Sequence, residues 1–378
     1  MRKYTLCLFL IYITLIGCKR DSSNGTVACV SSMDIEEAKY ISSVFSDFKL
    51  IRLETTDESL IGQRINKIKK HGGKYFISYD NTALVIFDSQ GRFIRKIGED
   101  GRGPGEYTHL YDFDVLPDGN IVISDGKKLL FYSDIGEFIK AIELSIACIN
   151  IKVIDNDCFL VCASAEDYSV YLINGNGMIL SEQLERNNRM VLRRNVAFFA
   201  LGKDHILYQQ DNSNNFLSFN VRTREFADIN LLCNEDNVLN IEEVRKYQNL
   251  LEYEKHNPNA KQIGGVASYI NYLFFYVMDQ SDLKCYLLNA SDNTVDGLFT
   301  KNTIDDISFT NIFSLLNYVG LSDSEECLMT LVWPHEIVKR LNDSTELSSH
   351  PNNLSLRSLL ENVHDIEGAN PVLIELRR

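Results

Sequence analysis

Short stretches of alternating apolar and polar residues recur along most of the chain, separated by glycine, aspartate and asparagine. The first copy covers residues 66–98. Its apolar stretches are 65–68, which begins one residue earlier, 75–79, 84–88 and 93–97. Alternating β-branched and aromatic residues between such turns are typical of short antiparallel strands. The pattern therefore predicts an all-β fold built from four-stranded meanders.

The same order of strands and turns returns further along the chain. Residues 111–144 and 149–184 repeat it closely, while residues 196–232 and 264–299 repeat it loosely. A glycine recurs in the last turn at Gly91, Gly136 and Gly177, at intervals of 45 and 41 residues. A sixth copy begins near residue 309, with strands expected around 315–318 and 327–332 and a final strand over 371–376. An internal repeat of this length is typical of propellers.

Two insertions interrupt the later copies. Within residues 233–261, Asn240 and Glu243 have the spacing of a capping box, and Pro258 follows an amphipathic stretch. Residues 334–341 and 354–362 predict further helices, within an insertion near 334–362. The sequence thus predicts short helices added to an all-β frame.

A single meander has too little core to fold alone, because both faces of its sheet need cover. A closed ring of meanders buries these faces and leaves only short outer edges. We therefore predict a six-bladed β-propeller of four-stranded antiparallel blades over residues 47–378. The early strand 48–53 is expected to pair beside the C-terminal strand and close the ring.

The N-terminus has the layout of a secretory signal. Arg2 and Lys3 precede an uncharged apolar run, and the run ends in Leu15-Ile16-Gly17-Cys18. This ending resembles the lipobox of bacterial lipoproteins, so residues 1–17 are predicted to be removed and Cys18 to carry the lipid. Residues 18–46 are then the lipidated cysteine and a flexible tether, and the membrane is a partner through the anchor.

Charge and cysteine content narrow the function classes. Lys and Arg number 38 against 52 for Asp and Glu, a net charge of -14, which disfavours nucleic-acid binding. Beyond Cys7 and Cys18 seven of the nine cysteines remain, an odd number that cannot all pair. Cys158 and Cys162 are predicted to lie roughly 13 Å apart on one strand, too far to bridge. No CxxC motif occurs, so zinc-ribbon and thioredoxin-type functions lose their basis.

Several segments resemble a known family, the six-bladed β-propeller lipoproteins of Bacteroidota, whose blades are similar to NHL repeats. The segments are 53–62 (LETTDESLIG), 86–88 with 91–98, the loop 101–107 (GRGPGEY) and 370–374 (NPVLI). The resemblance implies the fold and a cell-envelope location, lipid-anchored to the outer membrane, but no general activity. Surface-exported members tend to carry acidic residues after the lipidated cysteine, whereas Lys19-Arg20-Asp21 follow here. Periplasmic and surface-facing positions both stay open.

The glycine-rich loop 98–107 is the most distinctive local feature. We predict binding residues at Arg102, Gly103, Gly105, Glu106 and Tyr107, with the two charges at the mouth of the channel. The alternative is a plain connection between blades, in which Arg102 bonds to Glu106 or to carbonyl oxygens. It is not a phosphate loop, because Pro104 lacks an amide proton and no helix follows.

Asp112 and Asp114 alternate on the next strand, so both carboxylates are expected to face one way. They suggest a cation or sugar-hydroxyl site, although a solvated strand start explains them as simply. The basic run at residues 67–70 is predicted to be a solvated face. His335-Glu336 followed by Lys339 lacks the second histidine of a zincin, and no nucleophile motif appears.

We therefore expect a non-catalytic binding or protein-interaction module whose ligand is a glycan, a peptide or a partner protein. No catalytic residue, metal ligand or cofactor is predicted. The alternative is a metal-dependent lactonase- or lyase-like enzyme with a divalent cation in the central channel. That alternative needs polar side chains from several blades to converge on the axis.

Overall fold

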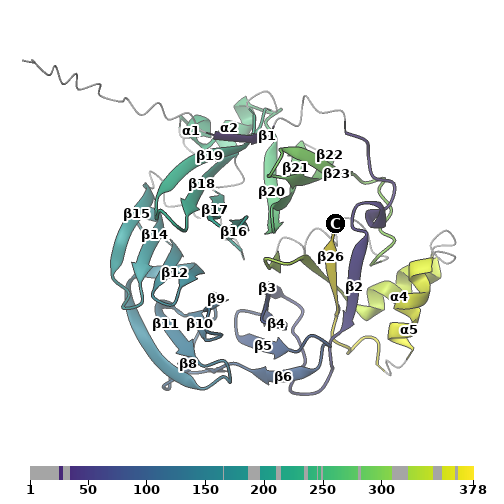
Figure 1. Ribbon diagram of the computed structural model, residues 1–378, viewed down its shortest axis with the longest axis horizontal. Helices are drawn as coiled ribbons and strands as arrows, with labels where there is room; N and C mark the ends of the chain where they lie inside the picture. The colour runs from purple at the N-terminus through teal and green to yellow at the C-terminus, as the bar shows by residue number, and fades with distance from the viewer. Residues whose placement is uncertain are drawn as a thin grey trace, which may run out of the picture.

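The strands form sheets arranged around a central axis, and successive chain segments follow one another round the ring (Figure 1). This computed structural model describes residues 25–28, 35–164, 166–185, 196–209, 214–233, 237–244, 246–247, 250–279, 282–308, 322–343, 351–361 and 365–378. The architecture is a β-propeller, which confirms the all-β prediction.

The first blade lies in residues that the sequence assigns to the first repeat. It contains β3 (Ile65–His71), β4 (Lys74–Tyr79), β5 (Ala83–Phe87) and β6 (Phe93–Lys96), each antiparallel to the next. A short distant strand, β24 (Ser322–Asp323), pairs in parallel with β3. The innermost edge of this blade is thereby extended by residues from the far end of the chain.

The second blade is a seven-stranded sheet. One long strand, β12 (Phe138–Asp155), pairs with its predecessor through its first part and with its successor through its second part. The other strands are β9 (Asp112–Val115), β10 (Ile121–Ser124), β11 (Gly126–Tyr132), β13 (Cys158–Ala163), β14 (Tyr168–Asn174) and β15 (Ile179–Glu185).

The third and fourth blades continue the ring. The third contains β16 (Phe198–Leu201), β17 (His205–Gln209), β18 (Asn215–Asn220) and β19 (Phe226–Leu232). An N-terminal strand, β1 (Gly25–Ala28), pairs in parallel with the outer edge of β19. The fourth contains β20 (Gln262–Tyr269), β21 (Tyr272–Asp279), β22 (Asp282–Asn289) and β23 (Thr294–Phe299).

A three-stranded sheet closes the ring and joins both ends of the domain. In it β26 (Val372–Arg377) lies between β2 (Asp47–Arg52) and β25 (Leu328–Val332), antiparallel to both. The predicted pairing of the early strand with the C-terminal strand is confirmed.

The prediction of six four-stranded blades is wrong. Counting each continuous sheet of four or more strands as a blade, the described residues form four blades. The predicted strands 138–144 and 149–154 are one strand, because residues 145–148 contain no turn-forming glycine, proline or asparagine and stay extended. Two predicted blades therefore share a sheet. The predicted strand 315–318 lies outside the described residues.

The folded domain begins earlier than the predicted boundary at residue 47. In the predicted tether, a short 3-10 helix (Ile41–Ser43) places Ile41 and Phe45 in the core. The amide of Ser42 donates to Asp306 Oδ1 at 3.0 Å. Residues 35–46 thus pack beside the fourth blade, because three apolar side chains in a polar segment find a buried position there.

The predicted helical insertions are confirmed. Residues 233–261 contain two short helices, α1 (Ile241–Val244) and α2 (Leu250–His256), rather than one. The insertion between β25 and β26 contains α4 (Pro334–Asp343) and α5 (Pro351–Leu360). Figure 1 shows these last two helices outside the ring beside the closing sheet.

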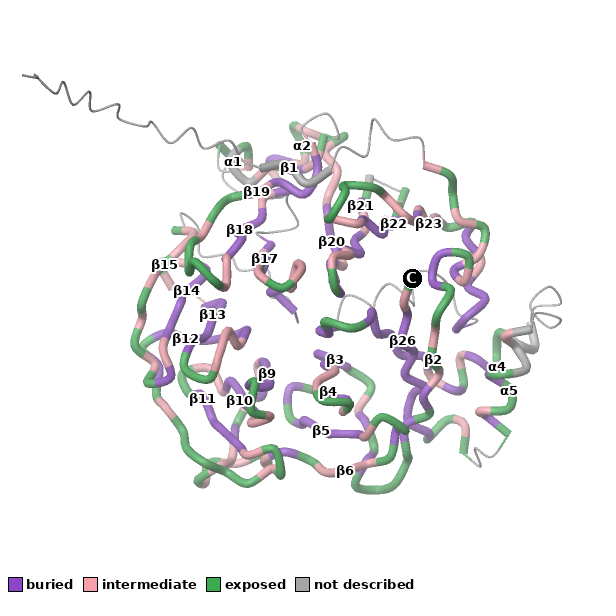
Figure 2. The backbone as a smooth tube through the Cα atoms, viewed as in Figure 1, coloured by how far each residue is buried: buried purple, intermediate pink, exposed green. Residues whose placement is uncertain are grey.

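The repeated glycine has a packing reason. Gly91, Gly136 and Gly177 have φ values of +80°, +82° and +80°, a left-handed conformation that glycine adopts without strain. Each lies against the preceding outer strand, and a Cβ at Gly91 would lie 2.2 Å from the carbonyl oxygen of Arg52. Figure 2 shows buried positions along the strands and exposed positions in many turns. The glycines let the outer turns pack closely on the neighbouring strands.

Candidate functional site

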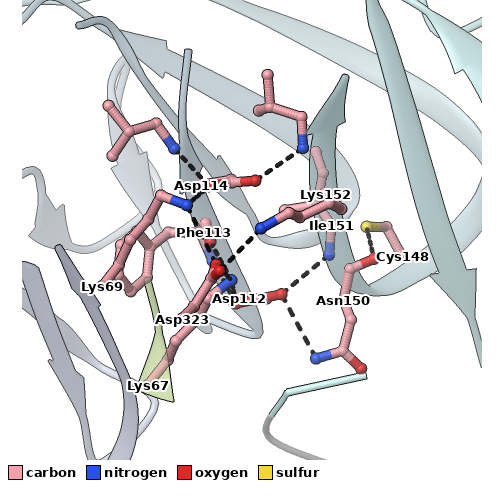
Figure 3. Close-up of polar contacts among 12 residues, drawn as sticks. Lys67, Lys69, Asp112, Phe113, Asp114, Cys148, Asn150, Ile151, Lys152 and Asp323 are labelled. Carbon is pink, nitrogen blue, oxygen red and sulfur yellow. Dashed lines mark hydrogen bonds and ion pairs between the residues drawn. The ribbon is translucent and has the colours of Figure 1, made fainter. Parts of the chain in front are cut away.

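Charged side chains of both signs meet at the centre of the ring (Figure 3). Lys67 and Lys69 come from β3, and Asp112 and Asp114 come from β9. Lys67 Nζ lies 3.1 Å from Asp112 Oδ1, and Lys69 Nζ lies 2.7 Å from Asp114 Oδ1. Alternation along each strand directs these side chains to one face, so the innermost strands supply matched pairs.

Asp323 connects three lysines in this cluster. Its Oδ2 lies 3.1 Å from Lys69 Nζ and 3.4 Å from Lys67 Nζ, and its Oδ1 lies 2.8 Å from Lys152 Nζ. Lys152 comes from the second part of β12, and Asp323 from β24. The axial cluster, defined as Lys67, Lys69, Asp112, Asp114, Lys152 and Asp323, therefore contains three positive and three negative groups.

Backbone amides occupy the other carboxylate lone pairs. Asp112 Oδ2 accepts from the amide of Ile151 at 2.9 Å, and Asp114 Oδ2 accepts from the amide of Val153 at 2.7 Å. Each aspartate also accepts from the amide of the residue that follows it, at 2.8 Å. The bonds from the amides of Ile151 and Val153 join β9 to β12 within the second blade.

The electrostatics of the cluster follow from burial and charge together. Burial opposes ionisation of Asp323, but the charges of Lys152 and Lys69 outweigh it and hold the pKa of Asp323 well below its ordinary value. Burial also opposes the charge on Lys69, yet Asp114 and Asp323 raise its pKa above the ordinary value. Asp323 and Lys69 are therefore held ionised by their charged neighbours, whereas burial raises the pKa of Asp112 despite the opposing charge of Lys67.

This arrangement is suited to holding strands together at the axis. A divalent cation needs carboxylate oxygens that are free to coordinate it, whereas here lysine ammonium groups and amides lie beside these oxygens. Within the described ranges, no group of three or more His, Cys, Asp or Glu side chains is arranged to hold a metal.

The structure revises what the sequence indicates for these residues. Asp112 and Asp114 do share a face, but they are buried, so the solvated-strand interpretation is wrong. The solvated face predicted at residues 67–70 is also wrong, since Lys67 and Lys69 are buried at the axis. Neither Lys152 nor Asp323 is predicted from the sequence. The one local sign of this buried cluster is that Lys67 and Lys69 alternate along a strand.

The glycine-rich loop lies apart from the axis. It contains the two-residue strands β7 (Glu99–Asp100) and β8 (Glu106–Tyr107), which pair in parallel. Figure 1 shows β8 at the outer rim, and Gly105 packs against Phe138 at the start of β12. The prediction that this loop stands at the channel mouth is wrong, because the chain crosses the outer part of the blades before returning to the axis.

Within the loop, most of the predicted residues make internal contacts. Glu106 Oε2 accepts from the amide of Gly103 at 2.7 Å, and the Gly105 carbonyl accepts from the Tyr132 hydroxyl at 2.9 Å. Tyr107 is fully buried and donates to the Ile97 carbonyl. Arg102 is exposed and forms no ion pair with any described residue. The loop is thus a folded structure that presents one arginine.

An apolar surface adjoins this loop. Five of the eight large apolar residues that are exposed in the described part of the chain lie on the outer turns and strands of the second blade. We define the rim surface as Arg102 and Pro104 with Ile135, Phe138 and Ile139. Such concentrations of exposed apolar side chains mark interaction sites. Met178 and Leu180 are also exposed, in and after a turn that packs on Glu143 and Leu144 of β12.

A cavity of about 470 Å³ lies between the end of the closing sheet, the loop that follows β2 and the helical insertion with α4 and α5. Its lining includes Arg52, Thr55, Asp57, Leu60, Leu360 and Asp365. Asn370 shapes it, because its side-chain amide donates to the carbonyls of Glu54 at 2.6 Å and Ser59 at 2.9 Å. The segments 53–62 and 370–374, both part of the family resemblance, therefore meet in space.

The cysteines divide into two kinds. Cys148, Cys158, Cys162, Cys285 and Cys327 are buried thiols that form no disulfide, which agrees with the prediction that Cys158 and Cys162 do not bridge each other. Cys233 is disulfide-bonded. Cys18, the predicted lipid-attachment residue, lies outside the described residues. Among those described, no helix has the length and apolar character needed to cross a bilayer.

The chain belongs to the family defined by the domain of unknown function DUF4934, whose model matches residues 25–377. No curated protein has significant sequence similarity to the chain. Because the match includes β1 and extends to β26, the family covers the whole ring together with its N-terminal strand.

Solved structures show the same fold at low sequence identity. The crystal structure of a candidate exported protein from Bacteroides fragilis has 15% identity, covers 93% of this chain and 98% of that chain, and has a TM-score of 0.72. A Bacteroides caccae protein of unknown function has 14% identity over 62% of this chain and 81% of its own, with a TM-score of 0.39. The first supports a β-propeller found in Bacteroidota; the second is below the level that indicates a shared fold.

Proposed function

We propose that this protein is an envelope-anchored, non-catalytic β-propeller that acts as a protein-interaction module. The axial cluster carries the proposal. In it, three lysines neutralise the three carboxylates that converge on the axis from β9 and β24. The charged groups at the centre of the ring therefore stabilise the fold. We expect the binding site on the outer surfaces instead.

The cluster also weakens the enzyme alternative. A metal-dependent lactonase or lyase on such a fold needs axial carboxylates that are available to a cation. Binding a cation to Asp323 would displace Lys69 and Lys152 from contacts of 3.1 and 2.8 Å. Lys69 would keep its ion pair with Asp114, but the buried ammonium group of Lys152 would lose its one ion-pair partner among the described residues. That exchange is costly because unpaired buried charges are strongly disfavoured.

The rim surface is the favoured binding surface. Exposed Ile135, Phe138 and Ile139 offer apolar area, and Arg102 adds a cation without an ion-pair partner among the described residues. The guanidinium group of Arg102 can donate two hydrogen bonds to one carboxylate. Together with the apolar area, it suits a peptide or protein with apolar and acidic residues better than a glycan. The partner is therefore an envelope protein with an apolar segment beside a carboxylate.

Location in the cell envelope has three supports. The lipobox-like sequence ends at Cys18, and the similar Bacteroides fragilis protein is described as a candidate exported protein. Cys233 forms a disulfide, and disulfides persist in oxidising compartments such as the periplasm and the cell surface. We place the protein at the outer membrane, anchored by lipid and facing the periplasm or the exterior.

Site-specific cross-linking in intact cells tests the interaction. A photoreactive amino acid at Phe138 is expected to give one discrete cross-linked species, and Arg102→Glu is expected to abolish it. The same amino acid at Met278, an exposed apolar position on the fourth blade, is the matched control. Equal cross-linking from both positions, or persistence with Arg102→Glu, would contradict the rim surface.

Thermal melting of the purified protein tests the enzyme alternative. A ligand that binds the native state raises the melting temperature by mass action. The proposal expects no change with a chelator and no stabilisation by a panel of glycans. Loss of stability with chelator, restored by one divalent metal, would instead support a cation in the channel.

A further inference from the structure

The N-terminal strand is docked at one particular place on the rim. Gly25 of β1 pairs with Ile229, and Ala28 pairs with Leu232, in parallel with the outermost strand of the third blade. The folded ring therefore includes Gly25 at the outer edge of the third blade. Figure 1 shows β1 at the rim, across the ring from β8.

The distance from this edge to the proposed lipid is limited by covalent geometry. Cys18 precedes Gly25 by seven residues, and seven residues span at most about 25 Å when fully extended. A compact domain of this size has a radius of gyration of roughly 20 Å and is about 50 Å across. The tether is therefore shorter than the ring is wide.

We infer that the outer edge of the third blade, formed by β19 and β1, is the membrane-facing edge of the protein. The inference rests on the proposed anchor at Cys18. With the anchor in the bilayer, β1 stays within about 25 Å of the lipid, and the opposite rim is not tied to the bilayer in this way. This edge contacts the lipid headgroups of the bilayer.

This orientation also decides what the rest of the protein can contact. Figure 1 shows β8 across the ring from β1, and the rim surface adjoins β8, because Gly105 packs on Phe138. The tether does not draw the rim surface to the bilayer, so this surface is left open to a partner in the periplasm or outside the cell. The edge at β1 is the one that the tether keeps near the lipid.

Fluorescence quenching by a lipid-borne nitroxide tests the orientation. Full-length lipoprotein carrying Ala227→Cys or Lys96→Cys is labelled and reconstituted into phosphatidylethanolamine–phosphatidylglycerol vesicles containing the quencher. Both positions are exposed, on β19 and on β6 respectively, and the five described free thiols are buried. The expected result is a larger loss of fluorescence at position 227 than at position 96.

A longer tether is the matched control. A Gly/Ser segment of about 30 residues inserted after Asp21 adds a root-mean-square length of roughly 30 Å and removes the constraint, so quenching at position 227 should fall. Mass spectrometry of the N-terminal peptide shows separately whether Cys18 is acylated. An unmodified Cys18 overturns the anchor and the orientation together, whereas an acylated protein quenched equally or more at position 96 overturns the orientation alone.

Discussion

The side-chain oxygen of Asn370 accepts a hydrogen bond from the backbone amide of Ile61 at 2.8 Å, although 309 residues separate them. The amide nitrogen of the same side chain donates to the carbonyls of Glu54 and Ser59. One buried side chain therefore holds the loop between the closing sheet and the first blade. Two of the sequence segments that resemble the family are joined by this residue.

Asn370→Ala is expected to destabilise the domain. It leaves buried backbone groups without partners, at about 1–3 kcal/mol for each unsatisfied group. Chemical denaturation checks the change in unfolding free energy. Asn176→Ala, in an exposed turn, is the control and should have no measurable effect, and an equal loss in both variants would contradict the role of Asn370.

Asp323→Ala is expected to cost about 3–5 kcal/mol of unfolding free energy, because it leaves the buried Lys152 without a counter-charge. Lys152 loses its contact at 2.8 Å, while Lys69 loses its contact at 3.1 Å and keeps Asp114. Urea denaturation measures the loss, with Asp134→Ala in an exposed turn as control. A neutral effect would show that the axial cluster does not stabilise the ring.

The axial cluster predicts stability limits at both ends of the pH scale. The pKa of Asp323 is lowered, so its contribution is complete above the unfolded-state value near 3.9 and is lost as pH falls below it. The pKa of Lys69 is raised, so its contribution is complete below about 10.4 and is lost at higher pH. Between these limits Asp323 and Lys69 should not change the melting temperature. If the loss of stability in acid disappears in Asp323→Asn, that loss is caused by Asp323.

Arg102→Ala and Glu106→Ala are expected to behave differently. Arg102 is exposed without an ion pair among the described residues, so its removal should leave the melting temperature unchanged while weakening cross-linking from position 138. Glu106 accepts from the Gly103 amide, so its removal should lower the melting temperature. Differential scanning calorimetry compares the two, and a large drop for Arg102→Ala would show that the arginine is structural.

Gly91→Ala is expected to destabilise more than Gly72→Ala. Both glycines have positive φ, so each substitution costs about 1–2 kcal/mol in backbone strain. At Gly72 the added Cβ meets nothing within 4 Å, but at Gly91 it would lie 2.2 Å from the Arg52 carbonyl oxygen. Overpacking adds roughly 1–3 kcal/mol. Equal losses in unfolding free energy would show that the turn does not pack on β2.

The strands and turns were predictable because they depend on neighbouring residues. Alternating apolar residues located β3 to β6 within a few residues, and the repeated glycine marked turns that need positive φ. The ring closure by β2 and β26 was also predictable, since an open ring would leave apolar strand faces uncovered. The blade count was not, because nothing local distinguishes an extended link such as residues 145–148 from a break.

The candidate site depended on contacts that the sequence does not contain. Residues 67–70 have the pattern of a solvated basic face, and only the ring brings Asp323 to Lys69 across 254 residues. The loop around Arg102 was recognised from its glycines, but its place at the rim follows from the path of the outer strands.

The sequence by itself determined the strand order, the turn glycines, the helical insertions and the acidic net charge, because each depends on residue type and on spacing along the chain. Only the tertiary structure decided which strands share a sheet, which lysine faces which carboxylate, and where the N-terminal strand is docked. Those features depend on long-range pairing, in which a charge becomes a buried partner only after the ring has closed around it.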